Sequence, residues 1–355
     1  MTEQIGPYRI GTVIGESAMG TVYRGFDRER DRLVLIVVAH NPGLHEMVFR
    51  LVDQRRENRL FDQAAEKFPT ATFAVLELDL GDATLLPGFI DTHTHLAGEI
   101  GANMQLVPVT ESEVDGAYNA VKYGHRTILA GFTTVRDFGG EVTVGLGRAV
   151  ERGDIVAPRV IPSRYALGIT GGHCDATGYV PGVLEGDPAR GIANGPWEVV
   201  EAVRQQIKYG AQVIKTCATA GVLSMEGPVG AQQYTYEELQ AMVDEAGRHG
   251  IKVAAHAHGT EGIKAAVRAG VASIEHGSIL DDEAIRLMKE HGTYLVPTQY
   301  LADVIPLDAL PAPIRAKAEH VLPIMKQSFR RAVREGVRIA FGTDAGVYPH
   351  GENAG

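Results

Sequence analysis

The chain has 355 residues, of which 45% are hydrophobic and 22% charged, so it can bury a large core and is not disordered throughout. Its 34 Lys and Arg residues against 44 Asp and Glu residues give a net charge of −10. This balance argues against a general binder of nucleic acid or anionic membranes, which needs a surplus of basic side chains.

The cysteine content and the N-terminal sequence indicate the cellular compartment that the protein is expected to occupy. The two cysteines, Cys174 and Cys217, are too few for a disulfide-stabilised scaffold and suit a reducing compartment. The N-terminus lacks a basic region followed by an apolar run, and no apolar stretch reaches the roughly 18 residues of a membrane span. We therefore expect a soluble, cytoplasmic protein.

The first 88 residues differ in pattern from the rest of the chain. Short strand-like pieces occupy 8–39, a charged stretch at 42–67 is predicted to be helical, and 74–86 is predicted to return to strands. The segment 15–23 (GESAMGTVY) resembles the Gly-rich loop of a bacterial Ser/Thr protein kinase, with Ser17 in place of the middle glycine. The kinase lysine expected near Val37 is missing and no HRD or DFG motif follows, which favours a structural hairpin over an ATP site.

From residue 89 onward, short β-branched segments alternate with helical patterns, which indicates βα units and a parallel sheet. Eight strands between residues 89 and 344 match the size of a (β/α)8 barrel, typically about 250 residues. We predict this α/β barrel fold, with a doubly wound open sheet as the alternative. The predicted strands are 89–96, 133–138, 159–169, 212–218, 252–258, 273–277, 293–300 and 338–344, and the predicted helices are 111–130, 141–152, 197–210, 236–249, 260–270, 281–291 and 313–335.

The strongest local motif is His93-Thr94-His95 in LLPGFIDTHTHL. Residues two apart in a strand point to the same side, so both imidazoles can bind one cation through nitrogen. By itself, the pair could equally be two ordinary polar residues at a strand end.

Four more polar residues lie at or near the C-terminal ends of other predicted strands, where barrel enzymes place their active sites. They are Lys215, His256, His276 and Asp344. Each alone has a structural explanation, such as a helix cap for the aspartate or a paired buried lysine. Their convergence on one barrel mouth predicts a metal site.

These residues lie in motifs that resemble the amidohydrolase superfamily, most closely its imidazolonepropionase-like and Xaa-Pro dipeptidase (prolidase)-type members. The matching motifs cover roughly residues 80–347 and are LLPGFIDTHTHL, GFTTVRDFGG, GGHCDATG, IKTCATAGV, VAAHAHGTEGIKAAVRAGVASIEHGS and FGTDAG. The match is specific for the superfamily and weak for the substrate.

The resemblance implies a binuclear centre, most often of zinc. His93, His95 and Asp344 would hold one divalent ion, and His256 and His276 the other. Lys215, carboxylated by CO2, would bridge them, because a carbamate offers anionic oxygens that an ammonium lacks. The two cations would make hydroxide available, and Asp344 would pass its proton to the leaving nitrogen.

Other residues are weaker candidates. His258 faces the same side as His256 and is a candidate catalytic residue, while His173 in the Gly-rich loop could bind a substrate carboxylate. Arg164 and Tyr165, at the end of the third strand, are candidate substrate contacts. We further expect Arg136 and Asp137 to form a structural ion pair, and neither cysteine to be catalytic.

The two ends of the chain depart from the superfamily pattern. We divide the chain into a kinase-N-lobe-like β segment (1–40), a linker with partial β-sandwich strands (41–88) and the amidohydrolase barrel (89–355). Because the sequence ends soon after Asp344, we expect the barrel to lack its last helix and the returning C-terminal strands.

We therefore predict a binuclear metal-dependent amidohydrolase that cleaves an amide bond of a small dipeptide or N-acyl amino acid, such as Xaa-Pro. One alternative keeps the site but acts on a cyclic amide, lactone or phosphoester. Another is a catalytically impaired binding or regulatory barrel. The predicted partner is a small-molecule substrate, with no nucleic acid or membrane, and homo-oligomerisation is left open.

Overall fold

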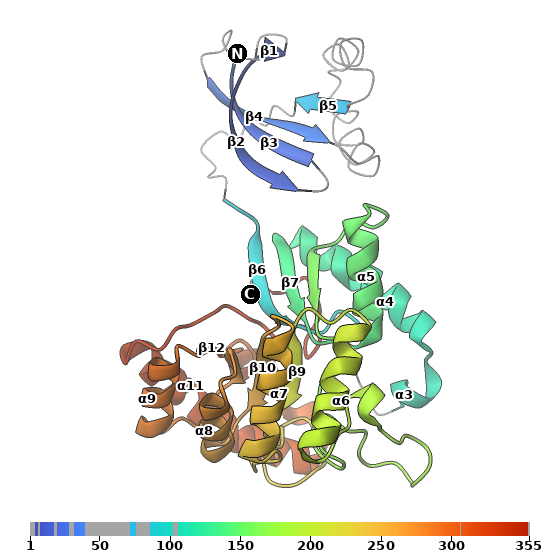
Figure 1. Cartoon of the computed structure of the whole chain (residues 1–355), viewed down its shortest axis with the longest axis vertical. Coiled ribbons are helices and arrows are strands. Elements are labelled where there is room, and N and C mark those ends of the chain that lie inside the picture. Colours follow the sequence, from blue (N-terminus) through green and yellow to red (C-terminus); the bar gives the residue numbers. More distant parts are fainter. Residues whose placement is uncertain are drawn as a thin grey trace. The chain divides into compact units, whose positions relative to one another are not determined.

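The structure, a computed structural model, describes residues 86–101, 106–305 and 307–353, together with the backbone of five N-terminal strands. Contacts divide the chain into two units, one of residues 1–87 and 148–156 and the other of residues 88–147 and 157–355. Each unit contains its own β-sheets (Figure 1).

The first unit contains an antiparallel sheet in the order β1-β2-β3-β4-β5. Ser17 of β2 pairs with Gly20 of β3, so the two strands of the kinase-like segment run antiparallel. The helix expected at 42–67 lies outside the described residues. The five strands are β1 Gln4–Ile5, β2 Tyr8–Ser17, β3 Gly20–Asp27, β4 Arg32–Ala39 and β5 Thr72–Val75.

The second unit contains parallel strands that match seven of the eight predicted ones. They form a three-stranded sheet, β6-β7-β8, and a four-stranded sheet, β12-β11-β10-β9. Every residue of β9, β10 and β11 is buried, as expected for a sheet covered on both faces. The strands are β6 Phe89–Thr94, β7 Phe132–Asp137, β8 Arg159–Pro162, β9 Ile214–Cys217, β10 Val253–Ala257, β11 Ser273–His276 and β12 Tyr294–Val296.

Two extended segments join these sheets into a ring. The predicted eighth strand, 338–344, is not a regular strand, but Ile339 pairs in parallel with Leu295 of β12, and Ala345 pairs with Thr94 of β6. On the other side, Leu167, which follows β8, pairs with Thr216 of β9. The barrel prediction is therefore confirmed.

Helices follow the strands of the second unit and cover the sheets (Figure 1). Ser112 and Thr235 close capping boxes at the starts of α4 and α7, and Gly270 and Gly292 end α8 and α9 in the left-handed conformation. The main helices are α4 Glu113–Leu129, α5 Glu141–Glu151, α6 Gly195–Lys208, α7 Tyr236–Arg248, α8 Thr260–Ala269, α9 Asp282–His291 and α11 Ala312–Arg334; short helical pieces are α3 Val107–Thr110, η1 Pro188–Arg190, α10 Leu301–Val304 and η2 Leu307–Ala309.

The hydrophobic core lies between the strands and these helices. Met242 of α7, Ile263 of α8 and Ile274 of β11 are fully buried within one cluster. This packing fixes the strand ends, and hence the polar residues that they carry, relative to one another.

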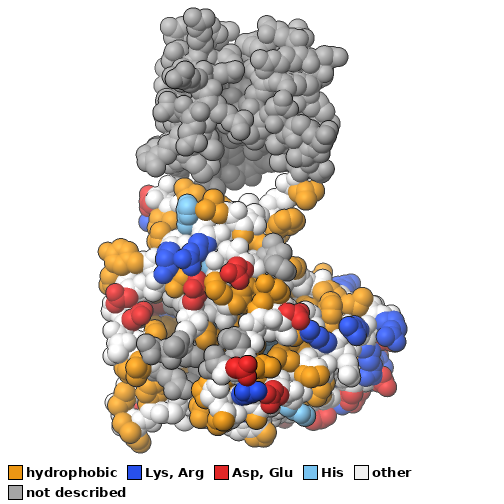
Figure 2. Space-filling view, turned by 180° about the vertical axis from the view of Figure 1, so that it is seen from behind, with side chains coloured by type: hydrophobic (Ala, Val, Ile, Leu, Met, Phe, Trp, Pro, Cys, Tyr) orange, Lys and Arg blue, Asp and Glu red, His pale blue; other side chains and the backbone are white. Residues whose placement is uncertain are grey.

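Charges of both signs intermingle on the side of the second unit formed around α8 and α9 (Figure 2). Arg268 pairs with Glu283 at 2.6 Å and Arg286 with Glu290 at 2.7 Å. In this region, basic and acidic side chains neutralise each other locally. Among the described residues, no helix combines the length and the apolar character needed to cross a membrane.

Candidate metal-binding active site

The C-terminal ends of the barrel strands surround a cavity of about 340 Å³. The structure brings all the predicted metal-binding residues to the wall of this cavity, although they lie on different strands. The wall includes His93, His95, Lys215, His256, His258, His276 and Asp344, and also the loop residue His173.

Two groups of side chains have ligand atoms close enough to share an ion. One is His93, His276 and Asp344, and the other is His256, His258 and His276, with ligand atoms within 4.8 Å of one another in each group. His276 belongs to both groups, whereas the resemblance implied that it holds only the second ion. His95 lies beside the first group, with Nε2 at 3.1 Å from Asp344 Oδ1.

Three of the imidazoles are oriented by hydrogen bonds at Nδ1. His93 bonds to Glu275 Oε2 (2.8 Å), His258 to Ser278 Oγ (2.7 Å) and His276 to Thr298 Oγ1 (2.8 Å). Such partners fix the ring and leave Nε2 for a ligand. His256 Nε2 is buried without a hydrogen-bond partner among the described residues.

Glu275 is a residue that the sequence reasoning missed. It is fully buried and contacts His93, Arg136 Nη2 (2.7 Å) and Ser273 Oγ (2.6 Å). The expected Arg136–Asp137 ion pair is therefore wrong, because the guanidinium instead compensates the buried charge of Glu275. The signal available in the sequence was an acidic residue in the middle of a strand predicted to be buried.

Asp137 instead accepts hydrogen bonds from residues at the end of β6. Its Oδ2 accepts hydrogen bonds from Thr94 Oγ1 (2.9 Å) and the Leu96 backbone nitrogen (2.7 Å). It therefore holds the end of β6, next to His93 and His95.

Burial lowers the pKa of four imidazoles that line the cavity, those of His93, His256, His258 and His276. The pKa of His93 falls to about 4, because of burial first and of the nearby Lys215 charge second, and that of His258 falls to about 3 by burial. Burial also lowers the pKa values of His256 and His276 well below their usual value. These imidazoles are therefore neutral near pH 7, which is the form that binds metal.

Lys215 and Asp344 are the charged groups of the cavity. Burial lowers the Lys215 pKa to about 8, and its Nζ lies 4.1 Å from the centre of the Phe138 ring. Burial acts to raise the Asp344 pKa, but His93, His95 and Lys215 together bring it below its ordinary value. Asp344 is thus a carboxylate at neutral pH.

Backbone strain is concentrated at this end of the barrel. His276 (φ 70°), Asp344 (φ 64°) and Thr298 (φ 46°) adopt the left-handed region that side chains rarely occupy. Thr298 is also the hydrogen-bond partner of His276. Strain held at two ligand candidates and their support is typical of a functional site.

Asp91, also missed from the sequence, connects β6 to the eighth segment. It is fully buried and accepts hydrogen bonds from Thr343 Oγ1 (2.6 Å), the backbone nitrogens of Thr343 and His93, and Asn353 Nδ2 (2.9 Å). It therefore ties the residue before Asp344 to the strand that carries His93.

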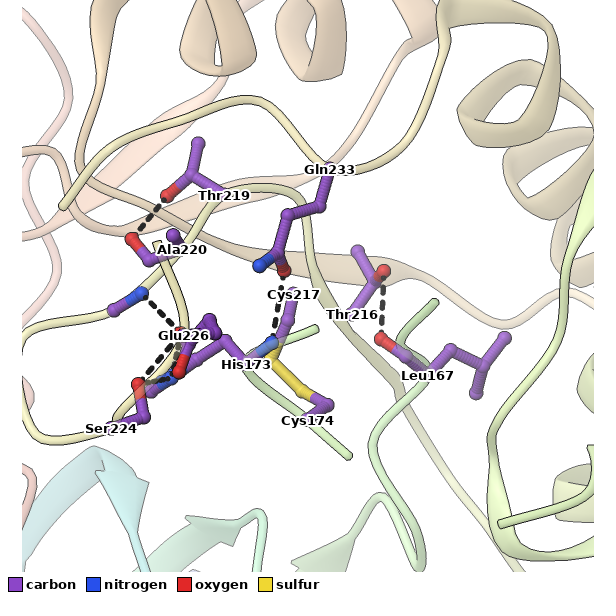
Figure 3. The surroundings of a disulfide bond; sticks show 11 residues. Leu167, His173, Cys174, Thr216, Cys217, Thr219, Ala220, Ser224, Glu226 and Gln233 are labelled. Atoms are coloured by element: carbon purple, nitrogen blue, oxygen red, sulfur yellow. Dashed lines mark hydrogen bonds and ion pairs between the residues drawn. A yellow bond between two sulfur atoms is a disulfide. The ribbon is translucent and has the colours of Figure 1, made fainter. Parts of the chain in front are cut away.

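His173 reaches the cavity from the Gly-rich loop after β8 (Figure 3). Its ring stacks on His256 with centroids 4.2 Å apart, and its Nδ1 lies 2.6 Å from Ser224 Oγ and 3.2 Å from Glu226 Oε1. Its backbone nitrogen donates to Gln233 Oε1 (3.1 Å). The loop tip is thus anchored.

A disulfide joins Cys174 to Cys217, next to His173 (Figure 3). Both cysteines line the cavity. This bond differs from the free thiols that a reducing compartment implies. It connects the Gly-rich loop to Cys217 of β9, which lies two residues after Lys215.

Arg164 and Tyr165 do not line this cavity. The Arg164 guanidinium donates to Glu141 (3.0 Å), Gln206 (2.9 Å) and the Ala189 carbonyl (3.0 Å). The Tyr165 hydroxyl lies 3.3 Å from Glu113 Oε1. Their contact with a substrate stays a prediction, and these hydrogen bonds indicate a structural role.

The fold and the cavity define an α/β barrel with a candidate metal site at the C-terminal ends of its strands. The profile of the Amidohydrolase family matches residues 84–354, and the chain belongs to this family.

Individual relatives agree with this membership. The ochratoxinase of Aspergillus niger is 33% identical over 277 residues, which cover 73% of this chain but 58% of the ochratoxinase. The crystal structure of a Xaa-Pro dipeptidase with bound methionine in its active site is similar at 38% identity and a TM-score of 0.72, covering 80% of this chain and 73% of the dipeptidase. A prolidase complexed with N-methylphosphonate-L-proline is similar at 33% identity and a TM-score of 0.67, covering 78% of this chain and 71% of the prolidase.

Proposed function

We propose that this protein is a metal-dependent hydrolase that cleaves the amide bond of a small dipeptide or N-acyl amino acid with a free carboxylate. The observation that carries the proposal is the convergence of neutral imidazoles, Lys215 and Asp344 on one cavity. The relatives support it, since they are named as an ochratoxinase, a Xaa-Pro dipeptidase and a prolidase.

The donor set fits divalent cations such as zinc. His93, His258 and His276 each engage a partner at Nδ1, which leaves Nε2 for coordination, and the buried Nε2 of His256 lacks a partner among the described residues. A carboxylate, Asp344, faces the same space. Neutral imidazoles around a carboxylate form a site that Zn²⁺ favours.

We infer that one ion is held by His93, His95 and Asp344 and a second by His256 and His276, with carboxylated Lys215 between them. His258 is a further ligand candidate, given its distance to His256 and His276. Ions bound there would polarise the scissile carbonyl and make hydroxide available near neutral pH.

Two side chains then act on the substrate itself. Asp344, ionised and buried, accepts a proton at its carboxylate during attack and delivers it to the leaving nitrogen. His173, whose ring stacks on that of His256, offers an imidazole nitrogen to the substrate carboxylate. A carboxylate without such a partner would compete for the cations instead.

The test combines metal analysis with a hydrolysis screen. Protein purified with zinc and bicarbonate should contain about two metal ions per chain and should hydrolyse Xaa-Pro dipeptides or N-acyl amino acids. His173→Ala should lower kcat/KM roughly 10–150-fold on substrates with a free carboxylate and much less on amidated ones. Folded protein without bound transition metal would contradict the proposal, and equal losses on free and amidated substrates would remove His173 from it. Zinc as the natural metal and a cytoplasmic location remain predictions.

A further inference from the structure

One side of the cavity is apolar and carries none of the candidate metal ligands. It is formed by Leu301 of α10, Ile305 directly after α10, Met325 of α11 and Val347. We call these four residues the apolar wall. None of them carries a charge or a strong hydrogen-bonding group in its side chain. This side of the cavity therefore favours an apolar part of a ligand.

The apolar wall is supported by hydrophobic packing behind it. Leu301, Ile305 and Val347 belong to one cluster with the buried residues Ala345 and Tyr348. Side chains that are fixed by such packing lose little freedom when a ligand binds. The apolar wall is thus a preformed surface next to the residue before it in the cluster, Ala345, which follows Asp344 directly.

The apolar wall offers no partner to an ammonium group. Among the described residues that line the cavity, Asp344 is the only acid, and its Oδ1 lies 3.1 Å from His95 Nε2 and 3.4 Å from His93 Nε2. Asp303 of α10 is exposed and pairs with Lys326 of α11 at 2.6 Å. An ammonium at the apolar wall would lose its water without a replacement, which is costly.

The apolar wall and His173 come from opposite sides of the barrel. In the order of strands around the ring, β12 and the eighth segment stand opposite β8 and β9. The α10 segment follows β12 and Val347 follows the eighth segment, whereas His173 follows β8. A ligand whose carboxylate lies at His173 therefore extends across the candidate metal ligands towards the apolar wall.

We propose that the apolar wall binds the acyl group of the substrate, so that the preferred substrate is an N-acyl amino acid with a bulky apolar acyl group, and not a dipeptide with a free α-amino group. This inference rests on the proposed function, because it takes the cavity to hydrolyse an amide. It selects between the two substrate classes named there. Leu301, Ile305, Met325 and Val347 are then residues that determine specificity.

A matched pair of substrates tests the preference for a neutral acyl group. L-Phenylalanyl-L-proline and N-(3-phenylpropanoyl)-L-proline have the same carboxylate, phenyl ring and scissile bond, and they differ only in the α-amino group. At pH 7, kcat/KM of the zinc-loaded enzyme should be higher for the acyl compound by roughly 10-fold or more, because no ammonium is desolvated. An equal or higher kcat/KM for the dipeptide would overturn the proposal.

The pH dependence of this preference is a second check. An α-amino group has a pKa of roughly 8, so the dipeptide becomes neutral above that pH. The ratio of the two kcat/KM values should therefore fall as the pH rises from 7 to 9. Titration of the enzyme affects both substrates and largely cancels in the ratio. A ratio that does not change with pH would contradict the proposal.

A new carboxylate at the apolar wall should reverse part of the preference. In Ile305→Glu, an ammonium would gain a partner, and the ratio of kcat/KM for the acyl compound over the dipeptide should fall roughly 10-fold. Gln327→Glu, exposed on α11 and outside the cavity wall, adds the same charge and should leave the ratio unchanged. Because both rates come from one preparation, the ratio does not depend on the folded fraction. An unchanged ratio in Ile305→Glu would overturn the proposal.

Calorimetry on metal-depleted full-length protein tests the apolar wall without turnover. N-(3-Phenylpropanoyl)-L-proline should bind roughly 10-fold more tightly than N-acetyl-L-proline, with a more negative heat-capacity change. Met325→Ala should reduce this difference, whereas Ile324→Ala, half-buried on the same helix and outside the cavity wall, should not. Equal affinities of the two ligands for the wild type would overturn the proposal. If the zinc-loaded enzyme hydrolyses neither amide, the proposed function fails, while calorimetry still decides whether the apolar wall binds acyl groups.

Discussion

His93 Nδ1 lies 2.8 Å from Glu275 Oε2, and both side chains are almost completely buried although 182 positions separate them in the chain. The contact joins β6 to β11 across the barrel. Burial acts to raise the Glu275 pKa, but Arg136, His93 and Lys215 hold it at about 2, so the carboxylate remains charged. The charge strengthens the hydrogen bond that orients the His93 ring.

Replacing Glu275 should therefore weaken metal binding. Glu275→Gln keeps the shape but loses the charge, and we expect a 10–100-fold lower metal affinity, the usual cost of losing such a support. Competition with a chromophoric chelator measures this affinity. Glu283→Gln on the surface of α9 serves as the control, and an affinity for Glu275→Gln equal to that of the control would refute the role of Glu275.

Asp344 should be essential for proton transfer. Asp344→Asn keeps the shape and one carbonyl oxygen but cannot accept a proton. We expect kcat to fall roughly 10²–10⁴-fold, the usual range for loss of a general acid–base group, with metal partly retained. Steady-state rates with parallel metal analysis test this, and a wild-type pH–rate profile in the variant would contradict it.

Lys215→Ala should lose most activity. The neighbouring imidazoles stay in place, so short carboxylates in the buffer should partly replace the lost bridge. Rates measured with and without acetate or propionate show whether they do. Full activity in Lys215→Ala without any additive would show that Lys215 is no bridge.

Carboxylation of Lys215 should depend on pH. CO2 reacts with the neutral amine, and burial lowers the Lys215 pKa to about 8. The neutral fraction is then about half at pH 8 and about 1% at pH 6. In metal-depleted protein, uptake of ¹³C-bicarbonate, followed by ¹³C NMR, should therefore rise with pH up to about 8 and be absent in Lys215→Ala. Uptake that increases as the pH falls would be inconsistent with this environment.

The Cys174–Cys217 bond should stabilise the fold. It closes a loop between cysteines 43 positions apart, and we expect the double Cys→Ser variant to lose about 2–4 kcal/mol in free energy of unfolding. Urea denaturation with and without a dithiol reductant measures the loss. The reductant should not affect the double variant, and two titratable thiols in the native, air-oxidised protein would disprove the pairing.

The sequence by itself determined the barrel and its ligand candidates. Strand and helix periods are local, and parallel strands of one barrel expose their C-terminal ends at one face. His93 and His95, two apart on one strand, and the residues ending later strands therefore had to meet. Short β-branched segments that alternate with helical patterns predicted the parallel strands β9, β10 and β11, which are fully buried.

Only the tertiary structure decided which side chains touch. Glu275 pairs with His93 and Arg136, Ser224 and Glu226 both contact the Nδ1 atom of His173, and Cys174 bonds to Cys217. No periodic pattern or fixed spacing in the sequence predicts these contacts. Each one joins separate strands or loops, and their relative position depends on the packing of the whole barrel. Hydrogen bonds require atoms to approach within a few tenths of an ångström of one distance, and the pattern of residues along the chain does not carry that information.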